Sequence, residues 1–198
     1  MMKLGLLLSV IILLPSSNTH QWKLLRNEDD IKLYTRKVKG YKIKEVKALT
    51  TFHAPIETLE NTLKDIEGYT KWFDECKAAE QLTPIQNNEV YARFVLRVPF
   101  PFRNRDIVTK LRFKKISATK FKVYVTNKPT YIPEKRGLVR TPHFKSTWIF
   151  ESSDNGQKTK TTTLLHADMG GVIPTWAINS AVRWGPFLSL KKMRKLVE

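Results

Sequence analysis

The sequence contains little of what disulfide, metal or nucleophile sites are built from. It has one cysteine, Cys76, and four histidines in 198 residues. A single thiol cannot form an internal disulfide, so a disulfide-stabilised fold is excluded. Outside the N-terminal segment the histidines are His53, His143 and His166, and they lack the His/Cys/Asp spacing of a metal site. We therefore expect Cys76 to be a buried small hydrophobe and predict no metal ion and no cofactor.

The sequence also lacks the motifs of common catalytic sites. It has no Gly-rich phosphate loop, no nucleophile elbow and no paired-carboxylate motif. His166 and Asp168 share one face of a predicted strand, but the alternation makes it the outer face, so we assign no catalysis to them. We predict a protein that is not an enzyme and has no catalytic residue.

Acidic side chains are scarce relative to basic ones. The chain has 18 Asp and Glu against 35 Lys and Arg, which gives a formal net charge of +17. Such an excess of positive charge favours binding to a nucleic acid or to an anionic membrane. Because no recognition helix is present, we predict no nucleic-acid partner. The outward basic positions form either a solvated face or a surface for transient contact with an anionic membrane. They include Arg93, Arg97, Lys110, Arg112 and Lys114.

Hydrophobic runs are short, and the clearest one is at the N-terminus. Residues 4–14 are mostly apolar, follow Lys3 and precede Pro15. This run is shorter than the roughly 18 residues that span a bilayer, and its layout is typical of a signal peptide. We expect residues 1–20 to direct secretion across the inner membrane to the periplasm and residues 21–198 to form one domain. Because the cleavage site is poorly defined, an uncleaved anchor stays open.

Most of the remaining chain alternates apolar and polar side chains, which is the pattern of β-strands. In residues 90–98 the even positions are apolar and two odd ones are arginine, so the even positions point inward. The same test makes Ile107, Leu111 and Phe113 inward, then Phe121, Val123 and Val125, and then Phe144, Trp148 and Phe150. Strands are predicted over residues 31–38 and 43–52, which turn at Gly40, and over 90–98, 107–113, 121–125, 138–151 and 159–168.

Three segments show helical spacing. The first follows Pro55 and carries Ile56, Leu59 and Leu63, the second covers residues 69–79, and the longest runs from Pro174 to the C-terminus. The predicted order is two strands, two helices, several strands and one long terminal helix. This order predicts an α+β fold. In this fold a curved antiparallel β-sheet wraps around the C-terminal α-helix.

Four local patterns, in a fixed order, point to a family. They are the turn around Trp72, the Pro-Phe-Pro-Phe and Arg-Asp-Ile-Val segments of residues 99–108, an omega-type loop at residues 132–140 and the entry to the terminal helix at residues 168–179. Together they resemble START domains, the steroidogenic-acute-regulatory-related lipid-transfer family within the helix-grip superfamily. The resemblance covers nearly all of residues 22–197.

The resemblance implies an apolar tunnel between the sheet and the terminal helix that holds one hydrophobic ligand. A phospholipid, a fatty acid or an isoprenoid fits this expectation, whereas the acid–base pair expected of sterol-binding members has no clear counterpart. The tunnel candidates are Phe94, Leu96, Leu111, Phe113, Phe144, Trp148, Trp176 and Asn179. The implied lid is the omega loop with the terminal helix, and the residues expected to dock on a membrane are Tyr131, Ile132, Lys135 and Arg136.

We therefore expect a monomeric, secreted protein that binds and transfers a lipid. Two alternatives stay open. One is an enzyme of the wider helix-grip superfamily, similar to a cyclase or hydrolase, that acts on a polycyclic or aromatic substrate. The other is an interaction protein that uses the fold without a ligand. A lipid retained through purification would distinguish the carrier from the interaction protein, and a chemically altered ligand would indicate the enzyme.

Overall fold

The computed structural model describes residues 21–173 and 175–198, without the side chains of 175–177, 179, 180 and 182. The predicted signal peptide, residues 1–20, lies outside the described residues. Among the described residues, no helix is both long and apolar enough to cross a membrane.

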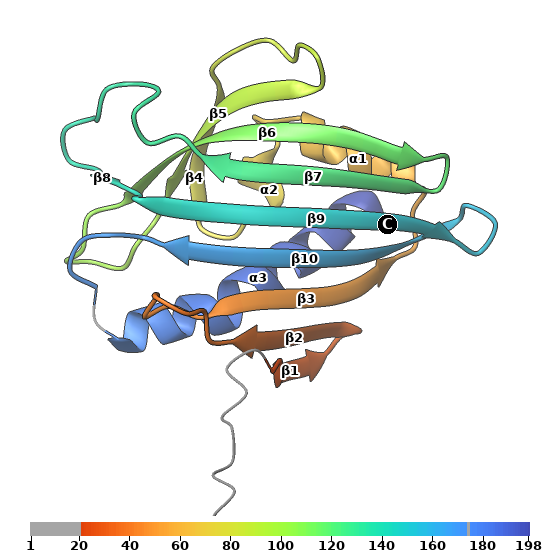
Figure 1. Cartoon of the computed structure of the whole chain (residues 1–198), viewed down its shortest axis with the longest axis horizontal. Helices are drawn as coiled ribbons and strands as arrows, with labels where there is room; N and C mark the ends of the chain where they lie inside the picture. Colours follow the sequence, from red (N-terminus) through yellow and green to blue (C-terminus); the bar gives the residue numbers. More distant parts are fainter. Residues whose placement is uncertain (1–20, 174) are drawn as a thin grey trace, which may run out of the picture.

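One large sheet forms most of the described chain (Figure 1). Its strands are β1 (Lys23–Glu28), β2 (Ile31–Arg36), β3 (Glu45–Phe52), β4 (Cys76–Gln81), β5 (Glu89–Leu96), β6 (Arg105–Ser117), β7 (Lys120–Asn127), β8 (Val139–Arg140), β9 (His143–Ser153) and β10 (Lys158–Asp168). Their spatial order is β1-β2-β3-β10-β9-β7-β6-β5-β4, and every neighbouring pair in that order is antiparallel. The short strand β8 pairs in parallel with β6.

β1 and β2 form a hairpin, and β3 pairs with β2. The sequence analysis did not predict β1. β1 turns into β2 through Asp29 and Asp30, whose φ angles of 50° and 55° are those of a tight two-residue turn. The Asp-Asp pair directly before the alternating residues 31–36 was the available signal for this turn. β2 and β3 are the predicted pair around Gly40, which has φ +83°, although both strands are shorter than expected.

Two helices follow β3. α1 (Ile56–Lys64) confirms the predicted helix and buries Ile56, Leu59 and Leu63. The predicted helix over residues 69–79 is wrong beyond its first turn, because α2 (Tyr69–Trp72) ends where Phe73 becomes extended. Glu75 then has φ +57°, and the chain pairs with β5 as the edge strand β4. Backbone pairing with the sheet overrides the helical preference of this polar segment.

The predicted long strand over residues 138–151 is two separate strands. β8 ends at Arg140 and β9 begins at His143, with Pro142 between them. Proline has no N–H to donate to a strand ladder, so it separates the two pairings. β8 crosses to β6, and β9 lies between β7 and β10.

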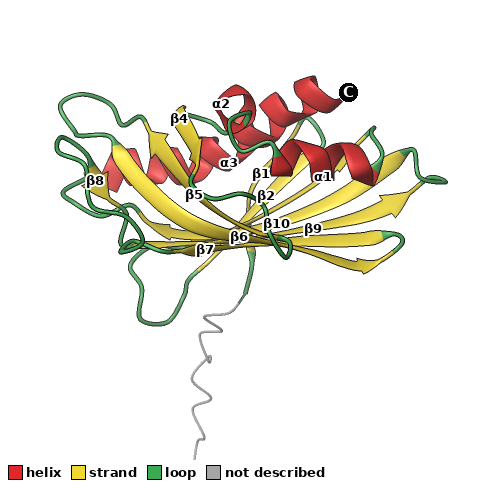
Figure 2. Cartoon of the chain, turned by 90° about the horizontal axis from the view of Figure 1, so that it is seen from above, coloured by secondary structure: helices red, strands yellow, loops and turns green. Residues whose placement is uncertain are grey.

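α3 (Thr175–Val197) is the long terminal helix, and all three helices of the described chain lie on one face of the curved sheet (Figure 2). This concave face carries the hydrophobic core. The inward positions predicted from alternation are buried there, among them Ile107, Leu111, Phe121, Val123 and Phe150. The sequence therefore predicted the sheet face correctly strand by strand.

The convex face has one buried ionic cluster that the sequence did not predict. Arg93, expected among the outward basic positions, is only 5% exposed. Its Nε donates to Asp106 at 2.7 Å, and Arg140 Nη2 donates to the other carboxylate oxygen at 2.9 Å. Asp106 thus pairs with two arginines on the convex side, and Arg93 Nη1 also lies 3.4 Å from a Glu80 carboxylate oxygen, so Arg93 contributes no free charge to that surface.

Candidate functional site

A cavity of about 660 Å³ lies between the concave face of the sheet and α3. Strands β3, β5, β6, β7, β9 and β10 form its wall on one side, and α2 and α3 form the other side. The α3 residues that face it include Ala181, Gly185 and Ser189. Ile178, Trp184 and Leu188 of α3 border it as well. The small residues among them leave space between the helix and the sheet.

Five of the eight predicted tunnel residues line this cavity, namely Phe94, Leu96, Leu111, Phe144 and Trp148. Phe113 is not among its lining residues. Its ring stacks on Phe121 with 6.3 Å between ring centroids, inside the solid core under α1. Trp176 and Asn179 belong to α3, but their side chains lie outside the described residues.

The interior of the cavity is apolar with a few neutral polar groups. Ser146 and Thr163 place hydroxyls on the wall from the adjacent strands β9 and β10. The hydroxyl of Tyr69 donates to the Leu63 carbonyl, and burial raises the pKa of this phenol. Lys44, Glu75 and Arg97, which are exposed, also border the cavity. Asp74, which pairs with Lys192, and Asp168 also border the cavity and are partly buried. The exposed charges lie where the cavity meets solvent.

Side-chain contacts hold α3 over the cavity. The Ser189 hydroxyl donates to the Gly185 carbonyl and accepts from the backbone N–H of Asp74. Lys192 Nζ lies 2.7 Å from the Asp74 carboxylate. On the opposite side, the Arg26 guanidinium lies 3.8 Å from the centre of a Trp184 ring. The C-terminal half of α3 is thus fixed from both sides of the groove.

The mouth of the cavity is formed by the loop between β5 and β6 and the loop between β10 and α3. Arg105, at the start of β6, joins them because its Nε and Nη2 donate to the carbonyls of Met169 and Gly170 at 3.0 and 2.7 Å. Gly170 has φ +65°, and a Cβ there would lie 2.7 Å from Pro142 Cδ, so the turn requires glycine. The predicted entry to the terminal helix is therefore a fixed part of the mouth.

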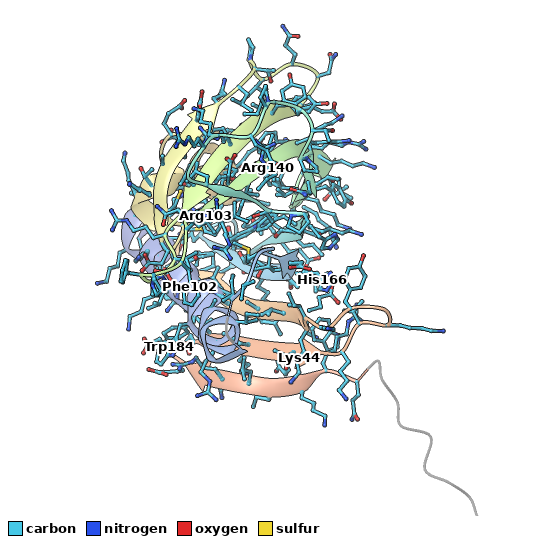
Figure 3. The ribbon with its side chains drawn as sticks, turned by 90° about the vertical axis from the view of Figure 1, so that its left-hand side faces the viewer. Lys44, Phe102, Arg103, Arg140, His166 and Trp184 are labelled. Carbon is cyan, nitrogen blue, oxygen red and sulfur yellow. The ribbon has the colours of Figure 1, made fainter. Side chains whose placement is uncertain are left out.

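The mouth presents apolar side chains that the sequence analysis did not select. Phe100 is 95% exposed and Val172 is 89% exposed. Arg97 and Arg103 are exposed on the same loop as Phe100. Figure 3 looks onto this end of the molecule, where Phe102, Arg103 and Lys44 lie around the end of α3. The Pro-Phe-Pro-Phe motif was quoted for its resemblance, and its position beside the cavity became visible only in the structure.

The predicted lid loop does not cover the cavity. None of Tyr131, Ile132, Lys135 and Arg136 lines it. The Tyr131 ring stacks on Tyr91, on the convex side of β5, with 3.9 Å between ring centroids. Arg140, held by Asp106, donates to the carbonyls of Ile132 and Pro133, both at 3.0 Å. These contacts tie the loop to the convex face, away from the residues that line the cavity.

The described residues contain no group of three or more His, Cys, Asp or Glu side chains placed to hold a metal ion. Cys76 is half-buried rather than fully buried, and burial raises the pKa of its thiol to about 11. A thiol with that pKa is almost entirely protonated near neutral pH, so it is a poor nucleophile.

Comparison with known proteins identifies the family. The START domain family model matches residues 7–198. An uncharacterized protein of Pseudomonas aeruginosa is 30% identical over 177 residues, which cover 89% of this chain and 87% of that protein. The phosphatidylcholine transfer protein of Rattus norvegicus is 27% identical over 188 residues, 91% of this chain and 86% of that protein.

Among solved structures, a STAR-related lipid transfer protein fragment from Xanthomonas axonopodis superposes with a TM-score of 0.82 and 29% identity. The match covers 89% of this chain and 98% of that one. The sheet, the terminal helix and their order agree with the helix-grip fold that the motifs predicted. The chain therefore belongs to the START domain family.

Proposed function

We propose that this chain binds one lipid in the cavity under α3 and carries it between membranes. The observation that supports this most strongly is the cavity itself, whose volume of about 660 Å³ lies within the range of ligand sites. A wall of Phe94, Leu111 and Trp148 suits hydrocarbon chains. The names of two relatives, a phosphatidylcholine transfer protein and a STAR-related lipid transfer protein, support the same class of cargo.

The distribution of charge around the cavity favours a lipid with a polar headgroup. Acyl chains would occupy the apolar interior, where each CH₂ removed from water contributes about 0.8 kcal/mol. The headgroup would stay at the mouth beside Lys44, Glu75 and Arg97, which offer both signs of charge. The expected ligands are a phospholipid, a fatty acid or an isoprenoid. Of these, a phospholipid has both acyl chains for the apolar interior and a headgroup for the charged mouth.

The mouth is also the surface that we propose contacts the membrane. Phe100 and Val172 project from the two loops that border it and are almost fully exposed. Arg97 and Arg103 beside Phe100 would be attracted to anionic headgroups, at about 1 kcal/mol per basic residue near the surface. Contact through this end would place the cavity opening against the bilayer, so that a lipid could exchange without crossing water.

We further propose that the protein works as a secreted monomer and makes no covalent change to its cargo. The formal net charge of +17 would attract the chain to an anionic membrane surface in the periplasm. Binding and release need only reversible burial of the lipid chains and movement of the loops at the mouth. Recovery of a chemically altered lipid from the protein would favour the enzyme alternative.

A vesicle assay with the variant Leu96→Asp tests this function. Donor and acceptor vesicles of phosphatidylcholine and phosphatidylglycerol would carry pyrene-labelled phosphatidylcholine, phosphatidylglycerol or fatty acid in turn. Leu96 is half-buried on the cavity wall, so a carboxylate there can stay hydrated in the empty protein but loses water against a lipid chain. We expect at least about a tenfold loss of transfer, which corresponds to about 1.4 kcal/mol.

Leu96→Met is the matched control because it keeps an apolar side chain of similar volume. It should transfer lipid at nearly the normal rate. If Leu96→Asp folds and transfers all three probes normally, or if the unaltered protein transfers none of them, the proposed function is wrong.

A further inference from the structure

A pair of histidines lies on the convex face at the mouth end of the sheet. His143 is the first residue of β9, and His166 lies near the end of β10. His143 Nε2 and His166 Nδ1 are 3.0 Å apart. The Tyr41 ring meets His166 edge-on, with 4.5 Å between ring centroids. His166 is only 7% exposed, because the segment between β2 and β3 packs over it.

This pair connects to the cavity through the start of β3. The backbone ladder between β3 and β10 ends at the pair of Val46 and Leu165. Beyond that point, His166 Nε2 lies 3.2 Å from the carbonyl oxygen of Ile43. Ile43 and Lys44 both line the cavity. Thus the imidazole, together with the packing of Tyr41, holds a piece of cavity wall where the strand ladder no longer does (Figure 3).

The hydrogen bonds define where the protons are. A carbonyl oxygen only accepts, so His166 Nε2–H must donate to Ile43. In neutral His166 the other nitrogen, Nδ1, then accepts, and His143 Nε2–H donates to it. A first extra proton can bind at His143 Nδ1 without disturbing this chain. A second would need to bind at His166 Nδ1, where it would face another N–H across 3.0 Å.

The surroundings disfavour a doubly charged pair. The register places Lys145 opposite His166 and Asp168 opposite His143. On the segment over the pair, Tyr41 is flanked by Lys42, and Lys44 follows. Burial, the His166 ring and Lys145 lower the pKa of His143, whereas Asp168 opposes this shift. One carboxylate among several cations cannot compensate two imidazolium charges in contact.

We propose that the histidine latch, defined as His143, His166, Tyr41 and Ile43, opens on acidification and loosens the cavity wall at residues 41–44. The lipid part of this inference, faster release at low pH, rests on the proposed function. The latch itself does not, because it can be measured on protein without lipid.

The direction of the pH effect follows from proton counting. The closed latch holds at most one extra proton, and the opened latch can hold two. Closing therefore depresses a histidine pKa, so the closed state has its full stability above the ordinary histidine pKa of 6.5 and loses stability as pH falls below it. One additional proton shifts the opening equilibrium by at most about tenfold per pH unit.

Hydrogen exchange of the lipid-free full chain, followed by mass spectrometry, tests the latch. Rates for residues 41–46 would be measured between about pH 7.5 and pH 5 and corrected for intrinsic exchange, a range chosen to span the histidine pKa. We expect protection of this segment to fall about fivefold from pH 6.5 to pH 5.5, a range in which the limiting slope is not yet reached, while protection in β7 stays constant. A flat profile for residues 41–46 would overturn the proposal.

Two variants sharpen the result. His143→Gln can donate an amide N–H to neutral His166 Nδ1 or turn its carbonyl oxygen to accept from a protonated His166 Nδ1–H. The closed and opened states then bind the same number of protons, so protection in this variant should be independent of pH. His53→Gln alters an exposed histidine just after β3, at the other end of that strand, and should behave like the unaltered protein. A pH response that survives in His143→Gln would assign it to another group and contradict the latch.

Release of pyrene-labelled phosphatidylcholine into vesicles of phosphatidylcholine and phosphatidylglycerol, measured over the same pH range, links the latch to transport. We expect release to accelerate up to about tenfold per pH unit in the unaltered protein and to stay flat in His143→Gln. A pH-dependent exchange profile in a protein that binds no lipid would reject the proposed function and keep the latch. A pH-independent release with a working latch would reject their coupling.

Discussion

The two ends of the concave face are built from the same strands but differ in what lies above them. At one end Phe113, Phe121 and Phe150 stack on neighbouring strands, with ring centroids about 6 Å apart. At the other end Phe94 and Leu111 lie along the same inward rows and border a cavity of about 660 Å³. Inward apolar side chains thus form solid core in one half of the groove and a ligand-sized space in the other.

The covering helices explain this difference. α1 lies over the packed end and buries Leu59 and Leu63 in the common core. At the open end, α3 borders the cavity with the small residues Ala181, Gly185 and Ser189 as well as with larger ones such as Trp184 and Leu188. Interiors that are filled at crystal-like density leave no space of this size, so the open end is not an ordinary piece of core. Alternation along a strand therefore identifies the buried face, and the helix above it decides whether that face is core or cavity.

Truncation of one apolar side chain at each end gives the largest expected contrast. Phe150→Ala at the packed end should lower the free energy of unfolding by about 3–5 kcal/mol, because it opens a void in a filled core. Leu96→Ala, at a half-buried side chain that already borders the cavity, should cost about 1 kcal/mol or less. Urea unfolding of both variants measures the two losses. Equal losses would mean that the two ends are packed alike.

A smaller effect is expected for the loops at the mouth of the open end. The double variant Phe100→Ser and Val172→Ser removes two exposed apolar side chains, whose burial in a bilayer would contribute about 1.5–3 kcal/mol for the phenylalanine. We expect vesicle-to-vesicle transfer to slow about tenfold, with the free energy of unfolding changed by less than about 0.5 kcal/mol. The rate of transfer and urea unfolding are measured on the same preparation.

Tyr131→Ser is the matched control for that experiment. It removes an exposed aromatic side chain from the loop on the convex face, where it stacks on Tyr91. The loss of this stack should cost about 0.5–1.5 kcal/mol in stability and leave transfer unchanged. Slower transfer in Tyr131→Ser than in the mouth variant would move the membrane contact back to the convex loop.

Sequence patterns predicted the central strands of the sheet but not its edge strands. Period-two alternation placed Ile107, Leu111 and Val123 on the buried face, because the pleat alone determines that side. The edge strands β1 and β4 were missed. β4 has a polar, helix-compatible sequence, and only the backbone of β5 makes it a strand. Such tertiary pairing leaves no periodic signal in the segment itself.

Only part of the candidate site was predicted, because contacts between distant segments again leave no signal in the sequence pattern. Phe94 and Leu111 line the cavity, but the same alternation also selected Phe113, whose ring lies under Lys64 of α1. The loop around Tyr131 was expected to be part of a lid because of the family resemblance, and its mixture of aromatic and basic residues was interpreted as a membrane-docking surface. Its true position depends on Arg140 and Asp106, which are 34 residues apart and meet only in the folded chain. Contacts of that kind are not visible in a single sequence.

The most direct test of a lipid-sized cavity is to determine what occupies it. Native mass spectrometry of the protein purified from the cells that produce it, with analysis of an organic extract of the same sample, would give the stoichiometry and class of any bound lipid. The account predicts one lipid per chain, with its mass unchanged from that of the membrane lipid. A folded protein that is empty on isolation, and stays empty after incubation with phosphatidylcholine and phosphatidylglycerol vesicles, would contradict it.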